Sequence, residues 1–138
     1  MNWGIYAVGS AVFAALVAVL GKIGLQGVDS TLATTVRAVV MAVFLVIVSL
    51  AFGKFSTLDT FSNKTMVFII FSGIAGALSW LCYFLAIKYG PVTGVVALDR
   101  TSVIFAFILA VIFLSESLTW QKAIGATLVT IGAILMAL

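Results

Sequence analysis

The stretch that decides the fold is residues 31–52, TLATTVRAVVMAVFLVIVSLAF, in which Arg37 is the single charged residue. A helix needs about 20 mostly apolar residues to cross the hydrocarbon core of a bilayer, and this stretch is long enough. It is about twice as long as a transmembrane β-strand needs to be, and its polar and apolar residues do not alternate. The stretch therefore predicts a membrane-spanning helix.

Four other stretches of similar length and composition lie on either side of it. The five predicted spans cover residues 3–23, 31–52, 66–87, 92–114 and 120–138. The first span has no basic residue before it and no obvious cleavage site, so we expect it to be retained rather than removed as a signal peptide. The sequence therefore predicts an all-α integral membrane protein with five transmembrane helices, one domain over residues 1–138.

Composition excludes most other classes of protein. Of the 138 residues, 64% are hydrophobic and 8% are charged. Soluble domains are about half apolar and about a quarter charged. There is no histidine, and Cys82 is the single cysteine, so the usual zinc ligands, histidine-based catalysis and disulfide frameworks are excluded. The basic residues form no run that nucleic acid would bind. We expect no metal, no cofactor and no enzymatic activity.

The basic residues divide almost evenly between the two faces of the membrane. Five spans place the termini on opposite sides, which assigns each Lys and Arg to a face. Toward one face lie Lys22, Arg37, Lys88 and Arg100. Toward the other lie the terminal amine, Lys54, Lys64 and Lys122. The positive-inside rule needs a clear excess on one face, so it does not fix the orientation of this multi-pass chain in the cell (cytoplasmic) membrane.

Three charges lie well inside the predicted spans, more than two residues from either end. Arg37 lies about six residues into its helix, and Asp99 and Arg100 lie about seven or eight residues into theirs, which is a depth near 9 Å or more from the same face. Each charge costs roughly 2.5–3.5 kcal/mol at the centre of a helix. Arg37 can form an ion pair with Asp99, extend to the headgroups along its own stem, or take part in substrate or proton handling. Aspartate is too short to reach the headgroups.

The third span carries a polar stripe at helical spacing. Its members are Ser72, Gly76, Ser79 and Tyr83, and Trp80 lies beside them. They share one face of a helix, which should turn toward other helices or toward a water-filled cavity. Both alternatives stay open. In a cavity, the stripe would form the wall together with Arg37 and Asp99, and its aromatic rings would suit cations or flat groups of an organic substrate.

The last span has small residues seven positions apart, which let two helices approach closely. They are Gly125, Ala126, Gly132 and Ala133. Spacing does not decide whether the partner helix belongs to the same chain or to a second chain. Glu116 lies in the turn before this span, where we expect it to cap the helix and compensate its dipole rather than to act as a gate.

With these residues laid out, the chain resembles the EamA-type proteins of the drug/metabolite transporter superfamily, specifically the half-size, five-helix bacterial and archaeal group. The resemblance covers the whole chain. It is carried by residues 21–24, 33–37, 72–73, 78–84, 86, 99–103, 113–116 and 125–132. The group more usually has Asp-Lys where this chain has Asp99-Arg100, which keeps the charge but changes the geometry of its contacts.

The resemblance implies an architecture and a partner. Full-length relatives have ten helices in two inverted halves around a central cavity, so a five-helix chain is expected to form an antiparallel homodimer with the last helices at the interface. The even division of basic residues is what insertion in both orientations requires. Residues 3–23 contain no acidic residue, so the proton-coupled mechanism of the small multidrug resistance transporters cannot be transferred.

The leading hypothesis is a secondary-active transporter of a small polar metabolite, such as an amino acid, working by alternating access. Arg37 and Arg100 would bind a carboxylate or phosphate, and Asp99 would accept a proton or a cationic group. The alternative is a non-transporting membrane scaffold or subunit of a larger complex, in which the polar residues only satisfy one another. No nucleophile–base pair or phosphate-binding loop can be assembled from these spans, which disfavours an intramembrane enzyme.

Overall fold

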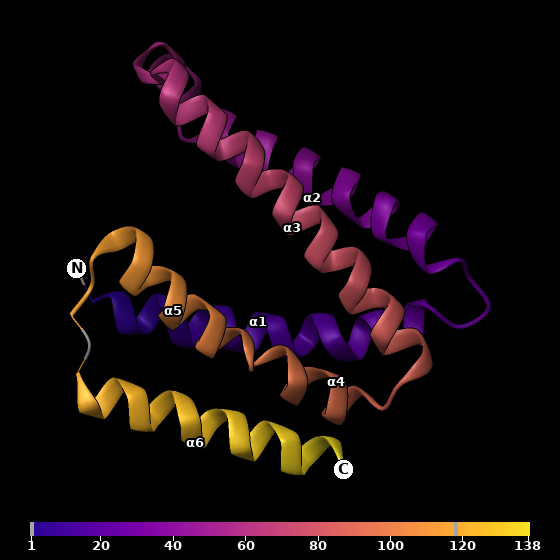
Figure 1. The fold of residues 1–138 in the computed structure, drawn as a ribbon. Helices are drawn as coiled ribbons and strands as arrows, with labels where there is room; N and C mark the ends of the chain where they lie inside the picture. The colour runs from indigo at the N-terminus through magenta and orange to yellow at the C-terminus, as the bar shows by residue number, and fades with distance from the viewer. Residues whose placement is uncertain (1, 118) are drawn as a thin grey trace. The chain divides into compact units, whose positions relative to one another are not determined.

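The computed structural model describes residues 2–117 and 119–138, and within them all regular structure is helical (Figure 1). The helices are α1 (Trp3–Gly24), α2 (Ser30–Ala51), the 3₁₀-helix η1 (Lys54–Thr60), α3 (Asn63–Tyr89), α4 (Val92–Asp99), α5 (Ser102–Leu114) and α6 (Trp120–Ala137). The predicted all-α fold is confirmed.

Five segments of the described chain are long and apolar enough to cross a membrane. They are α1, α2, α3, α4 together with α5, and α6. Only 6% of the most apolar window of each of the first four is buried within the structure, and 11% of that of α6. The apolar side chains of these helices are therefore left for lipid or for another protein to cover, which confirms the predicted membrane environment.

Contacts divide the chain into two compact units, so the prediction of a single five-helix domain stays a prediction. Residues Gly24–Lys88 form one unit, with α2, η1 and α3. The rest of the chain, with α1, α4, α5 and α6, forms the other.

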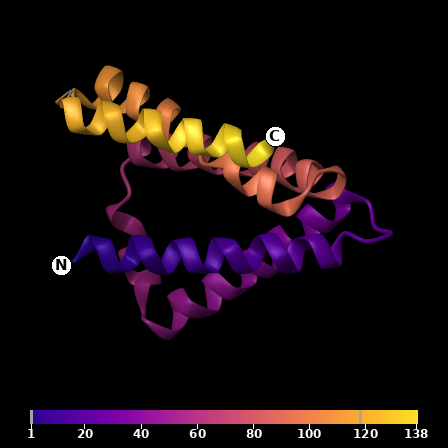
Figure 2. The ribbon, with the colours of Figure 1, turned by 90° about the horizontal axis from the view of Figure 1, so that it is seen from below.

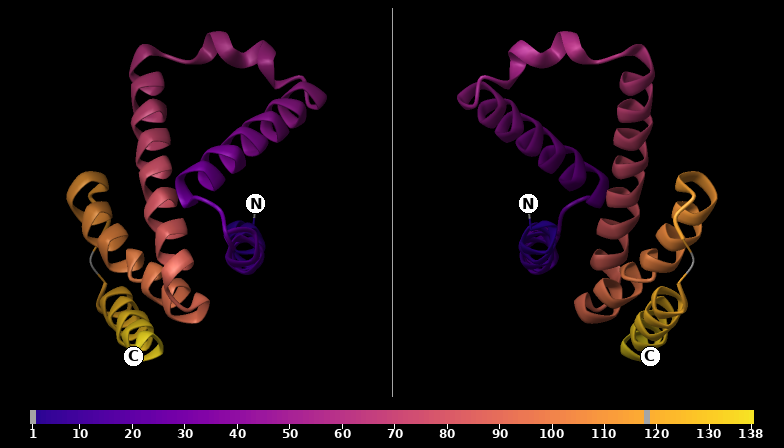
Figure 3. Two further views of the ribbon diagram at one scale, coloured as in Figure 1. Left: turned by 90° about the vertical axis from the view of Figure 1, so that its right-hand side faces the viewer. Right: turned by 90° about the vertical axis from the view of Figure 1, so that its left-hand side faces the viewer.

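In the unit Gly24–Lys88, local hydrogen bonds fix where the helices begin and end. The Asp29 carboxylate caps α2 by accepting the Leu32 N–H at 2.8 Å. Gly53, in the left-handed region at φ 63°, turns the chain from α2 into η1. The Lys88 ammonium, in the last turn of α3, donates to the Val28 carbonyl at 3.0 Å. Figure 3 shows that α2 and α3 diverge toward η1.

In the other unit, α6 lies beside α4 and α5 (Figures 1 and 2). Gly94 of α4 faces the end of α6: a Cβ there would be 3.6 Å from the Ala137 Cα and 3.8 Å from the Met136 carbonyl oxygen. Ala97 of α4 and the α6 residues Ala126 and Ala133 are buried. Small side chains therefore bring these helices close together.

Lys22, in the last turn of α1, makes the matching contact in this unit. Its ammonium donates to the Gly90 carbonyl at 3.0 Å, which ties the end of α1 to the turn before α4. A cation near the last carbonyls of a helix is also favoured by the helix dipole. Lys22 and Lys88 thus each join a helix end to a loop far away in the sequence.

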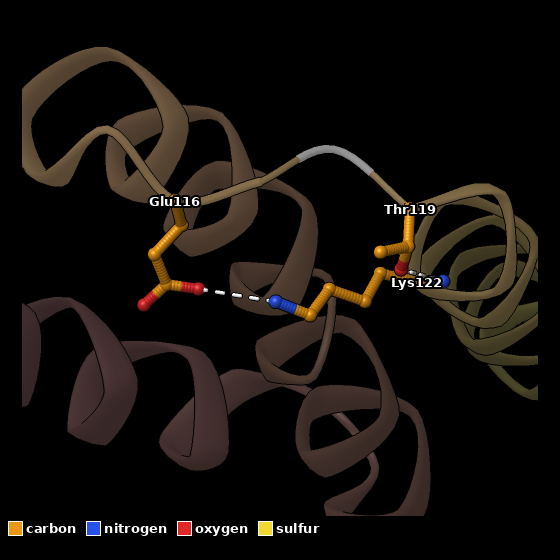
Figure 4. Close-up of polar contacts among 3 residues, drawn as sticks. All are labelled: Glu116, Thr119 and Lys122. Carbon is orange, nitrogen blue, oxygen red and sulfur yellow. Dashed lines mark hydrogen bonds and ion pairs between the residues drawn. The ribbon is translucent and has the colours of Figure 1, made fainter.

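The turn between α5 and α6 corrects one expectation. Thr119, not Glu116, caps α6, by accepting the Lys122 N–H at 3.4 Å. The Glu116 carboxylate instead pairs with the Lys122 ammonium at 3.3 Å, with both side chains about half exposed (Figure 4). Such an exposed pair contributes about 0–1 kcal/mol to stability. A threonine hydroxyl directly before the helix is better placed than a carboxylate three residues further away.

The close approach of α4 and α6 can be tested at Gly94. Gly94→Leu places atoms against the α6 backbone and should lower the free energy of unfolding by about 1–3 kcal/mol. Gly94→Ala adds only a Cβ at ordinary contact distance and should be tolerated. The measurement is the loss of helical circular dichroism during SDS titration of the purified protein. Gly9→Leu in α1 is the control, since a Cβ there meets nothing within 4 Å. Equal effects of the two leucine variants would contradict the packing described.

Candidate functional site

A groove of about 400 Å³ lies between α2 and α3 in the unit Gly24–Lys88. The α2 wall is formed by Thr34, Thr35, Arg37, Ala38 and Met41. The α3 wall is formed by Gly73, Gly76, Ala77, Trp80 and Leu81. This volume is at the lower end of the range for small-molecule sites, and the mixture of many apolar side chains with a few polar groups is typical of them.

The charge of the groove wall is the Arg37 guanidinium, which stacks on aromatic rings of α3. Its Cζ lies 3.6 Å from the centroid of the Trp80 ring and 5.2 Å from that of Phe84. Tyr83 meets the Trp80 ring edge-on at 5.5 Å. A cation over an indole gains roughly 0.5–2 kcal/mol, the larger values applying where water is excluded. The stack therefore offsets part of the cost of placing this charge in a membrane span.

Stacking leaves the N–H groups at the edge of the guanidinium plane able to bind a ligand. Among the described side chains of Gly24–Lys88, Arg37 has no carboxylate partner. A guanidinium in this state binds carboxylate or phosphate through two parallel hydrogen bonds. Arg37 is thus a partly buried cation whose described contacts are aromatic rings, in the wall of a groove of ligand size.

The two threonines of the groove use their hydroxyl protons within α2. Thr34 donates to the Ser30 carbonyl at 2.7 Å, and Thr35 donates to the Thr31 carbonyl at 2.9 Å. Their oxygens keep lone pairs that accept hydrogen bonds, but they offer no proton to an anion in this arrangement. Positive charge in the groove wall therefore comes from Arg37 alone among the side chains described there.

The polar stripe predicted on the third span lies one residue away from the face that lines the groove. Gly76 and Trp80 line it, and Tyr83 contacts the Trp80 ring. Ser72 and Ser79 are exposed and do not line it, so a role for them stays a prediction. The residues that sequence reasoning missed on α3 are Gly73, Ala77, Leu81 and Phe84. Gly73, Ala77 and Phe84 are spaced from Trp80 by seven, three and four residues, and Leu81 is four residues after Ala77, so a search for the face around Trp80 would have found them.

Asp99 and Arg100 lie in the other unit, where the fourth span is interrupted. α4 ends at Asp99 and α5 begins at Ser102. Between them, the N–H groups of Arg100 and Thr101 donate to carbonyls three residues back, at 3.0 and 2.9 Å. The Thr101 hydroxyl also donates to the Leu98 carbonyl, at 2.7 Å. A short stretch of 3₁₀ geometry within a helix often marks a hinge.

Both charged side chains at this break are exposed. The sequence predicts one uninterrupted span over residues 92–114. The structure instead divides this span into two helices, α4 and α5, at Arg100–Thr101. The proposed ion pair between Arg37 and Asp99 stays a prediction, because the two residues belong to different units.

On α6, the small residues divide into two neighbouring faces. Ala126 and Ala133 are buried within their own chain, at 7% and 5% exposure. Gly125 and Gly132 are exposed, and a Cβ at either would meet nothing within 4 Å. The alanines therefore pack within the chain. The glycines leave a flat exposed strip on the next face of the helix.

Cys82 is a free, exposed thiol on α3. Among the described residues, no three His, Cys, Asp or Glu side chains come together in a group that would hold a metal ion.

Comparisons with known proteins agree on one family. The family model described as the EamA-like transporter family matches residues 1–138. An uncharacterized transporter in the cobO 3′ region of Sinorhizobium sp. is 35% identical over 136 residues, which is 99% of this chain and 96% of the relative. A probable 4-amino-4-deoxy-L-arabinose-phosphoundecaprenol flippase subunit, ArnF, of Proteus mirabilis (strain HI4320) is 31% identical over 74 residues, 51% of this chain and 56% of the relative.

No solved structure matches the chain significantly. The family match nevertheless spans the full sequence, and the Sinorhizobium transporter aligns over nearly all of both chains. With five apolar helices of membrane-spanning length, the chain belongs to the EamA-like transporter family.

Proposed function

We propose that this protein is a secondary-active transporter of a small polar metabolite, such as an amino acid, in the cytoplasmic membrane. The groove between α2 and α3 forms part of its substrate site, and Arg37 binds the substrate carboxylate. The observation that carries the proposal is the Arg37 guanidinium, held 3.6 Å from the centroid of the Trp80 ring in the wall of the groove. Charged residues within membrane spans mark substrate and ion pathways.

The break between α4 and α5 supplies the second element of the proposal. Interrupted helices expose backbone and polar groups at membrane depth, and in transporters they form substrate and ion sites. Asp99 accepts a proton or the amino group of the substrate, and Arg100 provides a further contact for an anion. The 3₁₀ stretch allows α4 and α5 to change their mutual angle during alternating access.

We further propose that two copies of the chain assemble in opposite orientations, with the substrate site at their interface. The near balance of basic residues between the faces supports insertion in both directions. Gly125 and Gly132 provide an exposed strip on α6 for close packing against a second copy.

A second candidate function is that of a non-transporting subunit in a membrane complex. It is favoured by the name of the Proteus mirabilis relative, which is that of a flippase subunit. In that case the Arg37–Trp80 contact would serve only to stabilise the pair of helices. Transport by the purified chain alone distinguishes the two functions.

Substitution of Arg37 tests the proposed substrate site. In proteoliposomes that contain this chain as their only protein, we expect uptake of at least one labelled amino acid. Because a hydrogen bond to a charged group contributes about 1.5–3 kcal/mol, Arg37→Gln should weaken the apparent affinity about 10- to 100-fold. Arg37→Lys keeps the charge but loses the two-point contact, so its apparent affinity should lie between that of the unmodified chain and that of Arg37→Gln. Lys64→Gln, at the start of α3, is the control for loss of a basic residue. Equal uptake in all variants would remove Arg37 from the site.

Substitution of Asp99 tests the proposed coupling of transport to a proton gradient. Asp99→Asn keeps the size of the side chain but removes its negative charge and its ability to bind a proton. The substitution should therefore abolish the stimulation of uptake by an imposed pH gradient. Uptake without a gradient should fall less. Glu116→Gln, outside the apolar spans, is the matched control. If Asp99→Asn still responds to the gradient as the unmodified chain does, Asp99 is not the coupling residue.

The orientation of the chain is tested with two C-terminal reporters, one active inside the cell and one outside. Insertion in both directions should give comparable signals from both fusions, because neither face has a clear excess of Lys and Arg. Adding two lysines to the 53–65 loop should shift the signal toward one reporter. A single active reporter in the unmodified chain would contradict the antiparallel dimer.

A further inference from the structure

We infer that the groove selects organic anions with an apolar body over small hydrophilic anions and over zwitterions. This rests on the proposal that the groove is a substrate site, and it replaces the amino acid given there as an example with an organic carboxylate or phosphate that has no ammonium group. The head group of such a ligand is a carboxylate or phosphate bound to Arg37. Its carbon skeleton lies along the α3 wall at Gly73, Gly76 and Ala77.

The α3 wall leaves room directly over the helix backbone. A Cβ built on Gly73 or on Gly76 would meet nothing within 4 Å. These glycines are followed by Ala77, so three small residues lie on one side of the groove. An apolar body can therefore contact the helix itself, opposite Met41 and beside the Trp80 ring. A ligand consisting only of a hydrophilic head would leave this surface uncovered.

The charge of the groove favours an anionic head group without an ammonium group beside it. Arg37 lies on its wall, and the groove-lining side chains include no carboxylate. Asp29 of the same unit is engaged at the start of α2, where it accepts the Leu32 N–H at 2.8 Å. An ammonium group on the ligand would be repelled by the guanidinium and would find no negatively charged hydrogen-bond acceptor in the wall. An organic anion without an ammonium group therefore fits the groove better than an amino acid with the same body.

The experiment uses Trp80 as the reporter. The chain has three tryptophans, so the double variant Trp3→Phe/Trp120→Phe leaves Trp80 as the single one. Its fluorescence is titrated in lipid nanodiscs with phenylacetate, phenyl phosphate, acetate, phenylethylamine and phenylalanine. Equilibrium dialysis of labelled phenylacetate against the unmodified chain repeats the measurement without the substitutions.

We expect saturable binding of phenylacetate or phenyl phosphate, the better of the two identifying the head group. Acetate and phenylalanine should bind at least about tenfold more weakly, a difference of about 1.4 kcal/mol, and phenylethylamine should not bind. Arg37→Gln should weaken the binding of phenylacetate about 10- to 100-fold, and Lys64→Gln should leave it unchanged. Gly76→Leu fills the α3 wall and should weaken phenylacetate without changing acetate.

Three results would overturn the inference while leaving the proposed function intact. They are phenylalanine binding as tightly as phenylacetate, acetate binding equally well, and amino acid uptake in proteoliposomes without any binding of phenylacetate or phenyl phosphate. Loss of phenylacetate binding in nanodiscs that contain phosphatidylglycerol would assign the groove to a lipid headgroup, and would also overturn it. Binding as expected but without flux of any bound compound would instead overturn the proposed function.

Discussion

The interaction on which the unit Gly24–Lys88 depends is the stack of Arg37 on Trp80. Arg37 is the single charge of α2, and a guanidinium in an apolar span needs a partner that lowers its energy without water. The indole face supplies this at 3.6 Å to its centroid. The contact sets which face of α2 meets which face of α3, because it fixes one residue of each helix at a known position. The remaining groove residues are then those one or two turns away from this contact.

The same contact explains why the groove is open and why its cation is held in place. α2 and α3 diverge toward η1, so they do not close over the small residues of α3 (Figure 3). With the rings of Trp80 and Phe84 beneath Arg37, the guanidinium cannot turn away from the groove without losing its stabilisation. An aromatic platform thus holds the cation in position, which would reduce the entropy lost on binding of the anion that we propose for this groove.

The span number followed from the sequence because the bilayer imposes a minimum length, which hydropathy detects directly. The face of α3 did not follow so easily. The prediction placed Ser72, Gly76, Ser79 and Tyr83 on the inward face, with Trp80 beside them. The groove is lined instead by Gly73, Gly76, Ala77, Trp80 and Leu81, a face centred about 100° further around the helix. In lipid, small residues and a ring that stacks on a cation determine packing more strongly than two exposed hydroxyls. The aromatic partner of Arg37 depends on tertiary structure and has no signature in α2.

The break in the fourth span has a local cause that hydropathy does not register. The mean hydropathy of the span is 2.2, between the values of the uninterrupted helices α3 (2.0) and α2 (2.3), so Asp99 and Arg100 alone do not predict a break. The Thr101 hydroxyl and the Thr101 N–H both donate to the Leu98 carbonyl, which tightens the turn to 3₁₀ geometry. Threonine competes for backbone carbonyls in this way wherever water does not. The polar residues Asp99–Ser102 therefore have two effects. They place charge in the span, and they weaken the helix at the same residues. The coupling site that we propose requires both effects.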